Sequence, residues 1–252
     1  MQTKKLHDWN LSYQQAMALQ KQLSKKVQLV ELQNQPKTIA GIDCAFSKDG
    51  KRVIAAAVVL KIPDAQKGLW QPLTAPSFET IETTSAVQEV SFPYIPGLLS
   101  FREAPACIAA VEKLKNEPDV FIIDGQGIAH PRRLGLAAHL GLFFDKPTIG
   151  CAKSRLTGIF DEPQPQKGAY SLLKDKKRWK TETSHGPQVT NDGIIGAVVR
   201  TRTNVKPVFV SVGNKCLLKD AIETTLACTT KYRLPEPARL AHQLVSKLRL
   251  NA

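Results

Sequence analysis

The first part of the chain carries a helical pattern of apolar residues. Between residues 11 and 32 they recur every three or four positions, as Ala16, Leu19, Leu23 and Val27. This spacing places them on one face of a helix, and Ser12 is suited to the N-cap position. We therefore expect an N-terminal helix over residues 11–32, ending before Pro36.

Strand patterns follow this helix. The segments Thr38–Phe46 and Lys51–Ile62 are both strand-like, and Asp49 and Gly50 between them favour the backbone angles of a tight turn. This pattern predicts an antiparallel hairpin. The segment Phe78–Val90 is rich in Thr, Ile and Val, which favour strands, and we expect it to form the third strand.

The middle of the chain alternates helices with short apolar strands. After residue 97 an apolar stripe predicts a helix, with Ala106, Cys107, Ala110, Val111 and Leu114 on one face. Asp119–Asp124 and Pro147–Cys151 have continuously apolar interiors, which is typical of strands covered on both faces, and Arg132–Phe144 between them is helical in pattern. This order of elements predicts an α/β fold.

One later segment has little apolar periodicity. Residues 160–188 contain a basic run at 174–180 with one aromatic residue, Trp179, and we expect an exposed excursion there. The remaining patterns predict a second hairpin and two short helices, over Gly193–Arg200, Pro207–Val212, Leu217–Thr229 and Pro237–Leu248. We expect a single domain spanning residues 1–252, with the N-terminal helix and this excursion as extensions, although the length alone would also permit two small domains.

Composition adds a candidate partner. Hydrophobic residues make up 42% of the 252 residues, enough for one sizeable core. The 35 Lys and Arg residues outnumber the 22 Asp and Glu residues, which gives a formal net charge of +13 and a pI near 9.6. Such an excess suits DNA or RNA. A basic enzyme without such a partner is the alternative, because a charge total does not identify the chemistry.

Cysteine usage and apolar runs limit the class of protein. The five cysteines are odd in number and contain no Cys-x-x-Cys pair, so neither a disulfide framework nor a zinc knuckle is indicated. No signal-peptide core follows Lys5, and the apolar run Val53–Leu60 is far shorter than the roughly 18 residues of a membrane span. We expect a cytoplasmic protein with no membrane partner, and the lack of a coiled-coil pattern favours a monomer.

Two aspartates occupy positions that penalise a free carboxylate. Asp43 lies inside an apolar strand, where a buried charge is costly unless it is paired or binds a metal. Asp124 ends the strand before Gly125-Gln126-Gly127, at the end of a parallel strand where α/β sheets place ligands. The alternatives are a salt-bridged or edge-strand Asp43 and a simple Asp-Gly turn at Asp124.

A third acid is predicted to face the core. Glu103 precedes the apolar-stripe residues Ala106 and Cys107 by three and four positions, which turns its carboxylate toward the sheet. The alternative is a capping box, in which Ser100 begins the helix and Glu103 closes it. Pro105 argues against that register, because a proline beyond the first helical turn breaks the backbone bonding.

These three acids, Asp43, Glu103 and Asp124, can meet at one point. Hard oxygen ligands of this kind suit Mg²⁺, with Mn²⁺ as a substitute. Such an ion polarises a phosphate, activates water and stabilises the leaving oxygen. With the basic charge, this predicts a metal-dependent nuclease that cuts a phosphodiester.

Several motifs carry a specific resemblance. In order along the chain they are Gly41-Ile42-Asp43, Pro93-Tyr94-Ile95-Pro96-Gly97, Phe101-Arg102-Glu103, Asp124-Gly125-Gln126-Gly127, His130-Pro131-Arg132 and Ala152-Lys153-Ser154. In residue types and spacing they resemble the endonuclease V family, closely over residues 38–158 and more weakly over residues 233–242. The resemblance implies a ribonuclease H-like α/β fold, with an antiparallel hairpin unit continued by parallel strands in a mixed sheet flanked by helices.

The resemblance also implies an activity. Enzymes of this family recognise deaminated adenine in DNA, that is hypoxanthine in deoxyinosine, and hydrolyse the second phosphodiester bond on its 3′ side, leaving a 3′-hydroxyl and a 5′-phosphate. The expected function is DNA repair. Alternatives are a structure-selective magnesium nuclease of flaps or junctions, a ribonuclease of inosine-containing RNA, and a non-enzymatic module that binds inosine.

By resemblance, Asp43 and Asp124 are metal ligands and Glu103 is a third carboxylate that acts directly or through water. Lys153 and His130 are implied to lie near the scissile phosphate, and His242 near the metal. For these last residues the alternatives stay open: a structural salt bridge for Lys153, a helix-start contact for His130 and an ordinary surface or core histidine at His242.

Two further sets of residues are expected to read the lesion. Pro93 and Pro96 hold Tyr94 and Ile95 in a rigid loop, which is suited to act as a wedge that unstacks bases unless it is a turn packed on its own domain. By resemblance, the base pocket comprises Gly97, Leu99, Gly125, Gly127, Leu136 and Leu156, although the leucines could equally be core. Candidate phosphate contacts are Arg102, Arg132 and Arg133.

Overall fold

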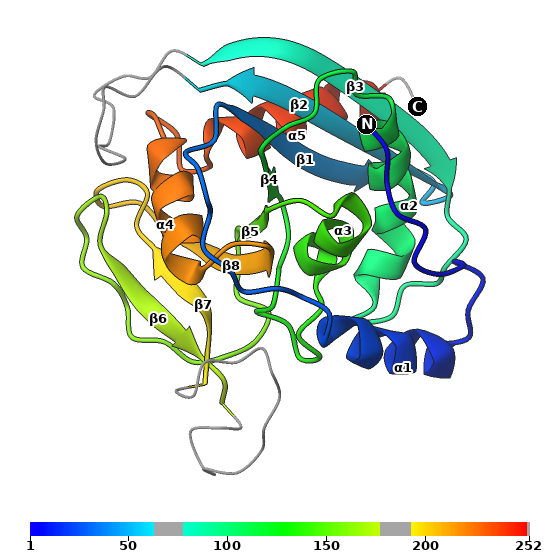
Figure 1. Cartoon of the computed structure of the whole chain (residues 1–252), viewed down its shortest axis with the longest axis horizontal. Coiled ribbons are helices and arrows are strands. Elements are labelled where there is room, and N and C mark those ends of the chain that lie inside the picture. Colours follow the sequence, from blue (N-terminus) through cyan, green and yellow to red (C-terminus); the bar gives the residue numbers. More distant parts are fainter. Residues whose placement is uncertain (63–77, 177–192, 251–252) are drawn as a thin grey trace.

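The computed structural model describes residues 1–62, 78–176 and 193–250 (Figure 1). The strands are β1 (Thr38–Phe46), β2 (Arg52–Lys61), β3 (Glu79–Glu89), β4 (Val120–Ile123), β5 (Thr148–Ala152), β6 (Tyr170–Lys174), β7 (Ile194–Val199) and β8 (Val208–Asn214). The helices are α1 (Tyr13–Ser24), α2 (Leu99–Glu112), α3 (Leu136–Phe144), α4 (Leu218–Ala227) and α5 (Glu236–Leu250). No helix in these described ranges is long and apolar enough to cross a membrane.

One mixed sheet joins all of these strands. Its order is β3-β2-β1-β4-β5-β8-β7-β6. The pairs β1–β4 and β4–β5 are parallel, and the other neighbouring strands run antiparallel. The β1–β2 hairpin turns at Gly50, whose φ of +71° is the left-handed conformation that glycine tolerates best. The predicted mixed α/β architecture is therefore confirmed.

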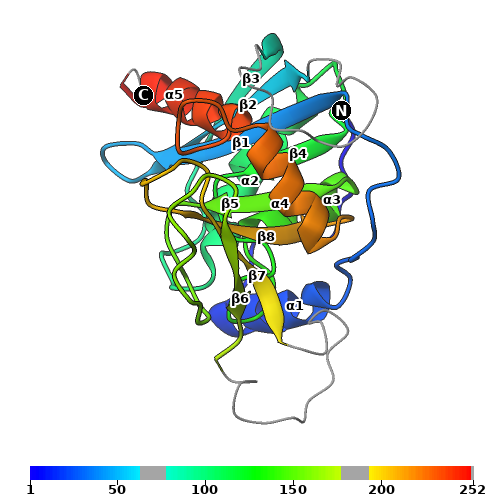
Figure 2. The same ribbon diagram turned by 90° about the vertical axis from the view of Figure 1, so that its left-hand side faces the viewer.

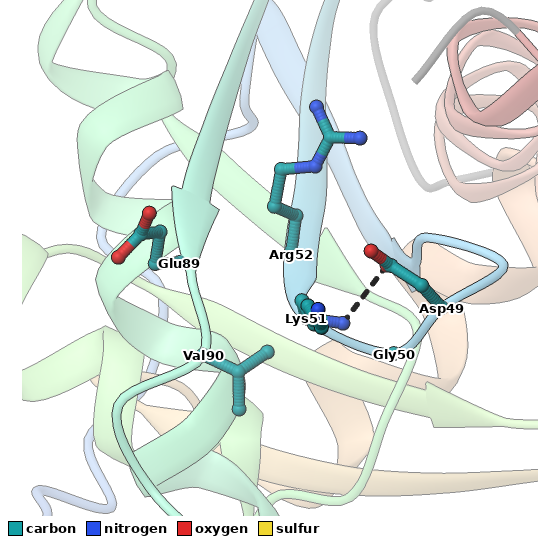
Figure 3. A pocket seen from close by; sticks show the side chains of 6 residues that line it. All are labelled: Asp49, Gly50, Lys51, Arg52, Glu89 and Val90. Carbon is teal, nitrogen blue, oxygen red and sulfur yellow. Dashed lines mark hydrogen bonds between the residues drawn. The ribbon is translucent and has the colours of Figure 1, made fainter.

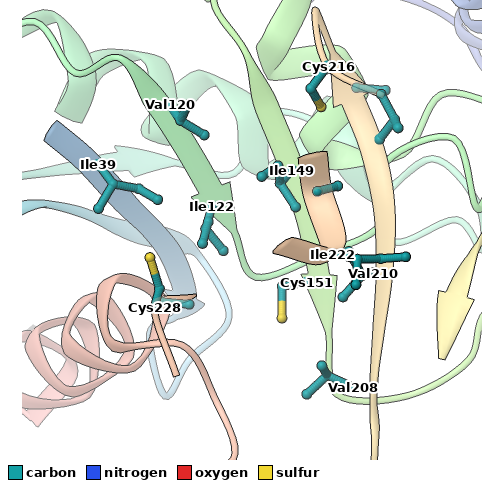
Figure 4. Close-up of a cluster of buried hydrophobic side chains, with 14 of the residues drawn as sticks. Ile39, Val120, Ile122, Ile149, Cys151, Val208, Val210, Cys216, Ile222 and Cys228 are labelled. Carbon is teal, nitrogen blue, oxygen red and sulfur yellow. The ribbon is translucent and has the colours of Figure 1, made fainter. Parts of the chain in front are cut away.

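Helices cover both faces of the sheet, as the alternation of side chains along its strands requires. On one face, Ile39 and Ile122 join a core that includes residues of α4 and α5 (Figure 4). On the other face, Ile42 and Phe121 pack against α2 and α3. All four residues of β4 are buried, as predicted for a strand covered twice. The helices α5 and α1 lie toward opposite ends of the molecule (Figures 1 and 2).

The N-terminal helix is shorter than predicted. Ser12 caps it, since the Ser12 hydroxyl accepts from the Gln15 amide at 3.3 Å, but the helix ends at Ser24 instead of continuing to residue 32. Beyond it, the Gln28 amide donates to the Asn214 side chain at 2.9 Å and the Gln28 carbonyl accepts from Lys215 at 2.8 Å. These bonds to distant residues replace the helical ones.

The helix predicted from Arg132 begins only at Leu136. Arg133 has a φ of 60°, which is incompatible with a right-handed helix. The Gly135 and Ala137 amides instead donate to the carbonyls of Gly127 and Gln126, both at 2.9 Å. The segment before α3 is thus a loop bound to the residues that follow β4.

The excursion predicted for residues 160–188 is partly regular. Residues 170–174 form β6, which pairs with β7. Arg200 holds the preceding loop, because its guanidinium donates to the Pro163 carbonyl at 2.8 Å and to the Glu162 carboxylate at 2.7 Å. The prediction missed this strand because backbone pairing at a sheet edge needs little apolar patterning. Trp179 and the end of the basic run lie outside the described residues.

Candidate metal centre

The two aspartates are brought together by the parallel pairing of their strands. Ile42 of β1 is the partner of Ile123 of β4, so the residues that follow them, Asp43 and Asp124, lie side by side. The Asp124 amide donates to the Ile42 carbonyl at 3.0 Å and extends this pairing by one residue. Register alone therefore places both carboxylates at the same end of the two strands.

A histidine from the C-terminal helix completes the group. A Cβ atom on Gly41 would lie 1.9 Å from the Pro237 carbonyl oxygen, so only glycine lets the start of α5 pack this closely on β1. Farther along α5, His242 places its Nδ1 atom 2.6 Å from an Asp43 carboxylate oxygen. The His242 side chain is 49% exposed, which leaves the group accessible to solvent and substrate.

These three residues have the donor set of a metal site. One ligand atom each from Asp43, Asp124 and His242 lies within 4.8 Å of the others. Lys153 lies beside them, with its ammonium 2.5 Å from Asp124 and 3.5 Å from the His242 Nδ1 atom. Two carboxylates and one imidazole fit a divalent cation that prefers oxygen ligands and accepts nitrogen.

The electrostatics of the site favour a bound cation. Burial raises the pKa of Asp43, and the negative charge of Asp124 raises it further, although His242 and Lys153 act in the opposite direction. Burial, followed by the charges of Asp43 and Asp124, raises the pKa of Glu103 to about 7. Carboxylates that repel one another in a low-dielectric site are stabilised in their charged forms by a divalent ion.

Glu103 belongs to this acidic cluster but does not cap a helix. Helix α2 has Leu98 at its N-cap position, so Ser100 lies inside the first turn, and no side chain caps the helix start. The Ser100 hydroxyl instead contacts the His139 Nδ1 atom at 3.1 Å. The capping-box alternative is therefore wrong. Glu103 interacts electrostatically with both aspartates but is not among the three residues whose ligand atoms lie within 4.8 Å.

His130 is a buried, neutral residue of the loop before α3. Its Nδ1 atom accepts from the Arg132 amide at 3.1 Å, and it is also hydrogen-bonded to the Gly97 backbone. Burial and the nearby Arg132 charge lower the pKa of His130 to about 4. These contacts link two loops, and the helix-start contact considered for His130 is wrong because α3 begins at Leu136.

The loop predicted to be a wedge has one exposed and one packed apolar side chain. Tyr94 is 66% exposed. Ile95 packs against a buried cluster that includes Phe92 and Phe101, and its carbonyl accepts from the Leu98 amide at 2.9 Å. Pro93 and Pro96 are exposed. Only Tyr94 is therefore available as an aromatic tip, while Ile95 anchors the loop.

The predicted pocket residues differ in what surrounds them. A Cβ atom on Gly127 would lie 2.0 Å from the Val212 carbonyl oxygen, and the Gly127 amide already donates to Ser211. The missing side chain at Gly127 thus serves packing between strands, and neither its space nor its amide is free for a base. Gly125 faces the buried Leu136.

The other pocket residues lie nearer the surface. Leu99, at the start of α2, and Gly97 are half-buried, whereas Leu156 is exposed. A separate pocket of about 580 Å³ lies beside the β1–β2 turn and contains none of the predicted base-pocket residues (Figure 3). Its lining residues are Asp49, Gly50, Lys51, Arg52, Glu89 and Val90.

The three candidate phosphate contacts already have partners within the protein. The Arg102 guanidinium lies 4.4 Å from the centre of the Phe46 ring and 3.5 Å from the Gly50 carbonyl oxygen. Arg133 pairs with the Asp175 carboxylate. Arg132 donates to the Gly97 carbonyl oxygen at 2.7 Å and to Gln20. Arg132 and Arg133 lie in the loop before α3, whereas Arg102 lies in the first turn of α2.

One residue near the site had no assigned role in the sequence. The Arg233 guanidinium donates to the Lys153 carbonyl at 2.6 Å and to the Pro207 carbonyl at 2.7 Å. It therefore fixes the backbone of the residue whose ammonium contacts Asp124. Arg233 belongs to the segment 233–242, which resembles the family, and this was the only sign of its role in the sequence. Its contact with the Lys153 backbone could not be predicted, because the two residues are 80 positions apart.

Comparison with known proteins shows which family this chain belongs to. The sequence profile described as Endonuclease V matches residues 21–243. Endonuclease V of Trichormus variabilis is 43% identical over 247 residues, which cover 98% of this chain and 99% of that protein. The crystal structure of endonuclease V from Streptomyces avermitilis has a TM-score of 0.81 at 36% identity and covers 100% of this chain and 99% of its own.

A third relative was solved with nucleic acid. The crystal structure of Ciona intestinalis endonuclease V holds a 24mer DNA containing an inosine followed by a ribo-adenosine. It has a TM-score of 0.67 at 26% identity, and the match covers 93% of this chain and 96% of that one. Nearly the full length is therefore shared with these proteins. The chain belongs to the endonuclease V family of metal-dependent DNA repair nucleases.

Proposed function

We propose that this enzyme recognises deoxyinosine in DNA and hydrolyses the second phosphodiester bond on its 3′ side, leaving a 3′-hydroxyl and a 5′-phosphate. The observation that carries the proposal is the meeting of Asp43, Asp124 and His242 at one accessible point beside Lys153. The inosine-containing DNA bound by the Ciona relative supports the choice of lesion.

Asp43, Asp124 and His242 would hold a divalent ion, which we propose to be Mg²⁺, with Mn²⁺ as a substitute. When bound, this ion supplies a Lewis acid for the phosphate oxygens. The accessible side of His242 leaves room for the substrate phosphate to approach. Oxygen ligands dominate the site, as Mg²⁺ requires.

Glu103 is the proposed proton acceptor. It is buried beside the two aspartates, and a bound divalent ion would keep its carboxylate charged and able to accept a proton. Water attacks phosphorus and loses a proton toward Glu103, and the bond between phosphorus and the 3′ oxygen breaks. That oxygen takes up a proton and becomes the 3′-hydroxyl, while the phosphate stays on the 5′ end of the next nucleotide.

Lys153 is proposed to stabilise the charge that develops during this displacement. Its ammonium lies at the acids, and the Arg233 contact fixes its backbone. A positive charge that is held in place before the reaction stabilises the transition state without reorganisation. His130, being neutral and bound to the Gly97 loop, is proposed to position the substrate-facing loop.

Tyr94 is proposed to read the lesion by inserting its ring where the damaged base leaves the stack. Its exposure supports this role, and extrusion costs least for a damaged or mismatched base. Gly97, Leu99, Gly125, Leu136 and Leu156 are the proposed lining of the base site. Arg102 and Arg132 are proposed phosphate contacts, and the net charge of +13 favours association with DNA. We also propose a cytoplasmic monomer.

The test uses a labelled duplex with one deoxyinosine and a matched duplex with deoxyadenosine, each incubated with Mg²⁺ or with EDTA. We expect cutting only of the lesion strand and only with Mg²⁺, one nucleotide beyond the lesion. Ligation and polymerase extension of the products report the 5′-phosphate and the 3′-hydroxyl. Equal cutting of both duplexes contradicts the lesion-specific function.

Additional substrates separate the rival functions. A single-stranded RNA with one inosine tests ribonuclease activity, and undamaged flap and junction substrates test structure-selective cutting. A preference for either over the deoxyinosine duplex would replace the proposal. Tight binding of deoxyinosine without any cutting would identify a binding module.

A further inference from the structure

A buried glutamine on α1 joins two loops, the one that carries Tyr94 and the one that precedes α3. Gln20 has a polar side chain but is completely buried, because it lies on the apolar face of α1. Its side-chain amide donates to the Gly97 carbonyl at 3.0 Å and to the Leu134 carbonyl at 2.7 Å. Its amide oxygen accepts from the Arg132 guanidinium. Both N–H groups and the oxygen are thus used, as burial of an amide requires.

The Gly97 carbonyl is the meeting point of this network. It also accepts from the Arg132 guanidinium at 2.7 Å, so Gln20 and Arg132 bind both each other and the same oxygen. Gly97 has a φ of +78° and ends the segment that carries Tyr94. A Cβ atom there would lie 2.7 Å from the Arg132 guanidinium and would displace it, and this φ is one that residues with a side chain rarely adopt, so the position favours glycine. The loop is therefore fixed at this end by hydrogen bonds.

The arrangement depends on a neutral partner. Among the described residues, no acidic side chain pairs with Arg132. Its orientation is set by the Gln20 oxygen and the Gly97 carbonyl. Within residues 1–62, 78–176 and 193–250, the charge of this half-buried guanidinium is therefore not paired with a carboxylate, and the guanidinium contacts the carbonyl at the end of the loop that exposes Tyr94.

We propose that Gln20 is a positioning residue that sets the orientation of residues 93–97, and thereby of Tyr94, and of the Arg132 guanidinium. This inference rests on the proposed function, in which Tyr94 and Arg132 contact DNA. The hydrogen bonds of Gln20 run to Gly97, Leu134 and Arg132, so it acts on substrate binding and not on the hydrolytic step. An apolar residue in its place removes the donor to the Leu134 carbonyl, one of the two donors to the Gly97 carbonyl and the acceptor of the Arg132 Nε–H group.

The first test measures the loop itself and needs no activity. We compare Gln20→Met, which keeps the size of the side chain, with Gln22→Met, the same change at an exposed position of α1. Hydrogen exchange at the amides of residues 97–99 should be at least about tenfold faster in the first variant only. Unchanged exchange in Gln20→Met overturns the positioning role. If that variant does not fold, Gln20→Glu serves, because it keeps the Arg132 partner and removes both donations to carbonyls.

The second test measures steady-state cutting of the deoxyinosine duplex. For Gln20→Met we expect KM to rise roughly tenfold, which is about 1.4 kcal/mol, with kcat within about twofold of the unchanged protein. In a Tyr94→Ala background the same substitution should raise KM less than in the unchanged protein, because one part of its effect acts through the loop that carries Tyr94 and the other part through Arg132. Additive effects, or a loss confined to kcat, contradict the inference.

The two tests separate this inference from the proposed function. If the unchanged protein does not cut at deoxyinosine, the proposed function fails, while hydrogen exchange still decides whether Gln20 holds the loop. If the unchanged protein cuts selectively but the Gln20 and Tyr94 effects are additive, only the inference fails.

Discussion

The Asp43 carboxylate and the His242 imidazole lie 2.6 Å apart although 199 positions separate them in the chain. The contact exists because β1 and α5 pack backbone to backbone at Gly41. A site that combines a strand near the N-terminal part with the last helix forms only when the whole chain has folded. Ion binding and global stability are therefore coupled.

Gly41→Ala should disrupt this packing. The added Cβ would lie 1.9 Å from the Pro237 carbonyl oxygen, so α5 must move and carry His242 away from Asp43. We expect a loss of stability of about 3 kcal/mol or more and a clear loss of Mn²⁺ affinity, measured by denaturation and by calorimetry. Gly50→Ala, where nothing lies within 4 Å of the added atom, is the control and should cost only about 1 kcal/mol. Equal effects of the two changes would argue against this account.

Asp43→Ala and Asp124→Ala should each abolish cutting and retain DNA binding. Each change removes one of the ligands that would hold the ion, and we expect kcat to fall by at least about a hundredfold. Asp49→Ala, on the exposed β1–β2 turn, is the matched control. Cleavage assays and binding by fluorescence anisotropy measure the two properties separately. Near-normal turnover in either variant would remove that residue from the mechanism.

Glu103→Gln should stabilise the ion-free protein at alkaline pH. Because the pKa of Glu103 is raised from 4.5 to about 7, the folded state favours the protonated form, and this contribution is present below about pH 4.5 and is lost as the pH rises through 7. At pH 8 the wild type carries a buried charge that glutamine lacks, a difference on the order of 3 kcal/mol. Urea denaturation in EDTA at pH 5 and pH 8 measures it.

The outcome should also depend on the ion. Added Mg²⁺ should stabilise the wild type more than Glu103→Gln, because the ion offsets the carboxylate repulsion. Activity of the variant should be low despite its greater stability. If the variant is no more stable than the wild type at pH 8 without metal, burial and the neighbouring aspartates do not raise the pKa of Glu103 as proposed.

Two buried histidines predict acid sensitivity. Burial lowers the pKa of His139 well below 6.5 and that of His130 to about 4. A lowered histidine pKa means that the stability present above about pH 6.5 is lost as the pH falls toward 4, by up to about 1.4 kcal/mol per pH unit for each proton. His139→Gln should reduce the dependence of the unfolding free energy on pH by up to about 1.4 kcal/mol per pH unit, because one fewer proton is taken up on unfolding. An unchanged slope in urea midpoints between pH 7 and pH 5 would contradict the assignment.

Tyr94→Ala and Ile95→Ala should separate recognition from stability. Tyr94 is 66% exposed, so its removal should change stability by less than about 0.5 kcal/mol yet weaken binding of the lesion duplex. Ile95 packs on the Phe92–Phe101 cluster, so its removal should lower stability by about 1–2 kcal/mol. Thermal denaturation and anisotropy on lesion and undamaged duplexes distinguish the two outcomes.

Much of the fold was predictable from local patterns. The hairpin Thr38–Phe46 with its partner strand, and the buried strand ending at Ile123, follow from apolar runs and from the turn at Gly50. Errors arose where tertiary bonds decide an element's end. The N-terminal helix stops at Ser24 because later residues bind Asn214, and α3 starts late because its preceding loop binds Gln126 and Gly127.

The site was predictable in part for the same reason. Asp43 and Asp124 could be recognised as candidate ligands because they are acids in apolar strands. Glu103 could be recognised because its position relative to the apolar stripe of α2 turns it toward the sheet. His242 was accessible only through family resemblance, since nothing near it in sequence reports a partner 199 positions away. Gln20 could be noticed in the sequence as a glutamine on the apolar face of a helix. The loops that it binds could not be predicted, because its partners lie far away in the chain.

The glycine packing behind the acids limits how this enzyme can diverge. Gly127 lies against the Val212 carbonyl, and a Cβ atom on Gly150 would lie 2.5 Å from the Gly127 nitrogen. A side chain at Gly127 or Gly150 would overlap the neighbouring backbone, so single substitutions at these positions cannot change the shape of this region in small steps. Under the proposed function, adaptation to another modified base would instead proceed through exposed positions such as Tyr94 and Leu156.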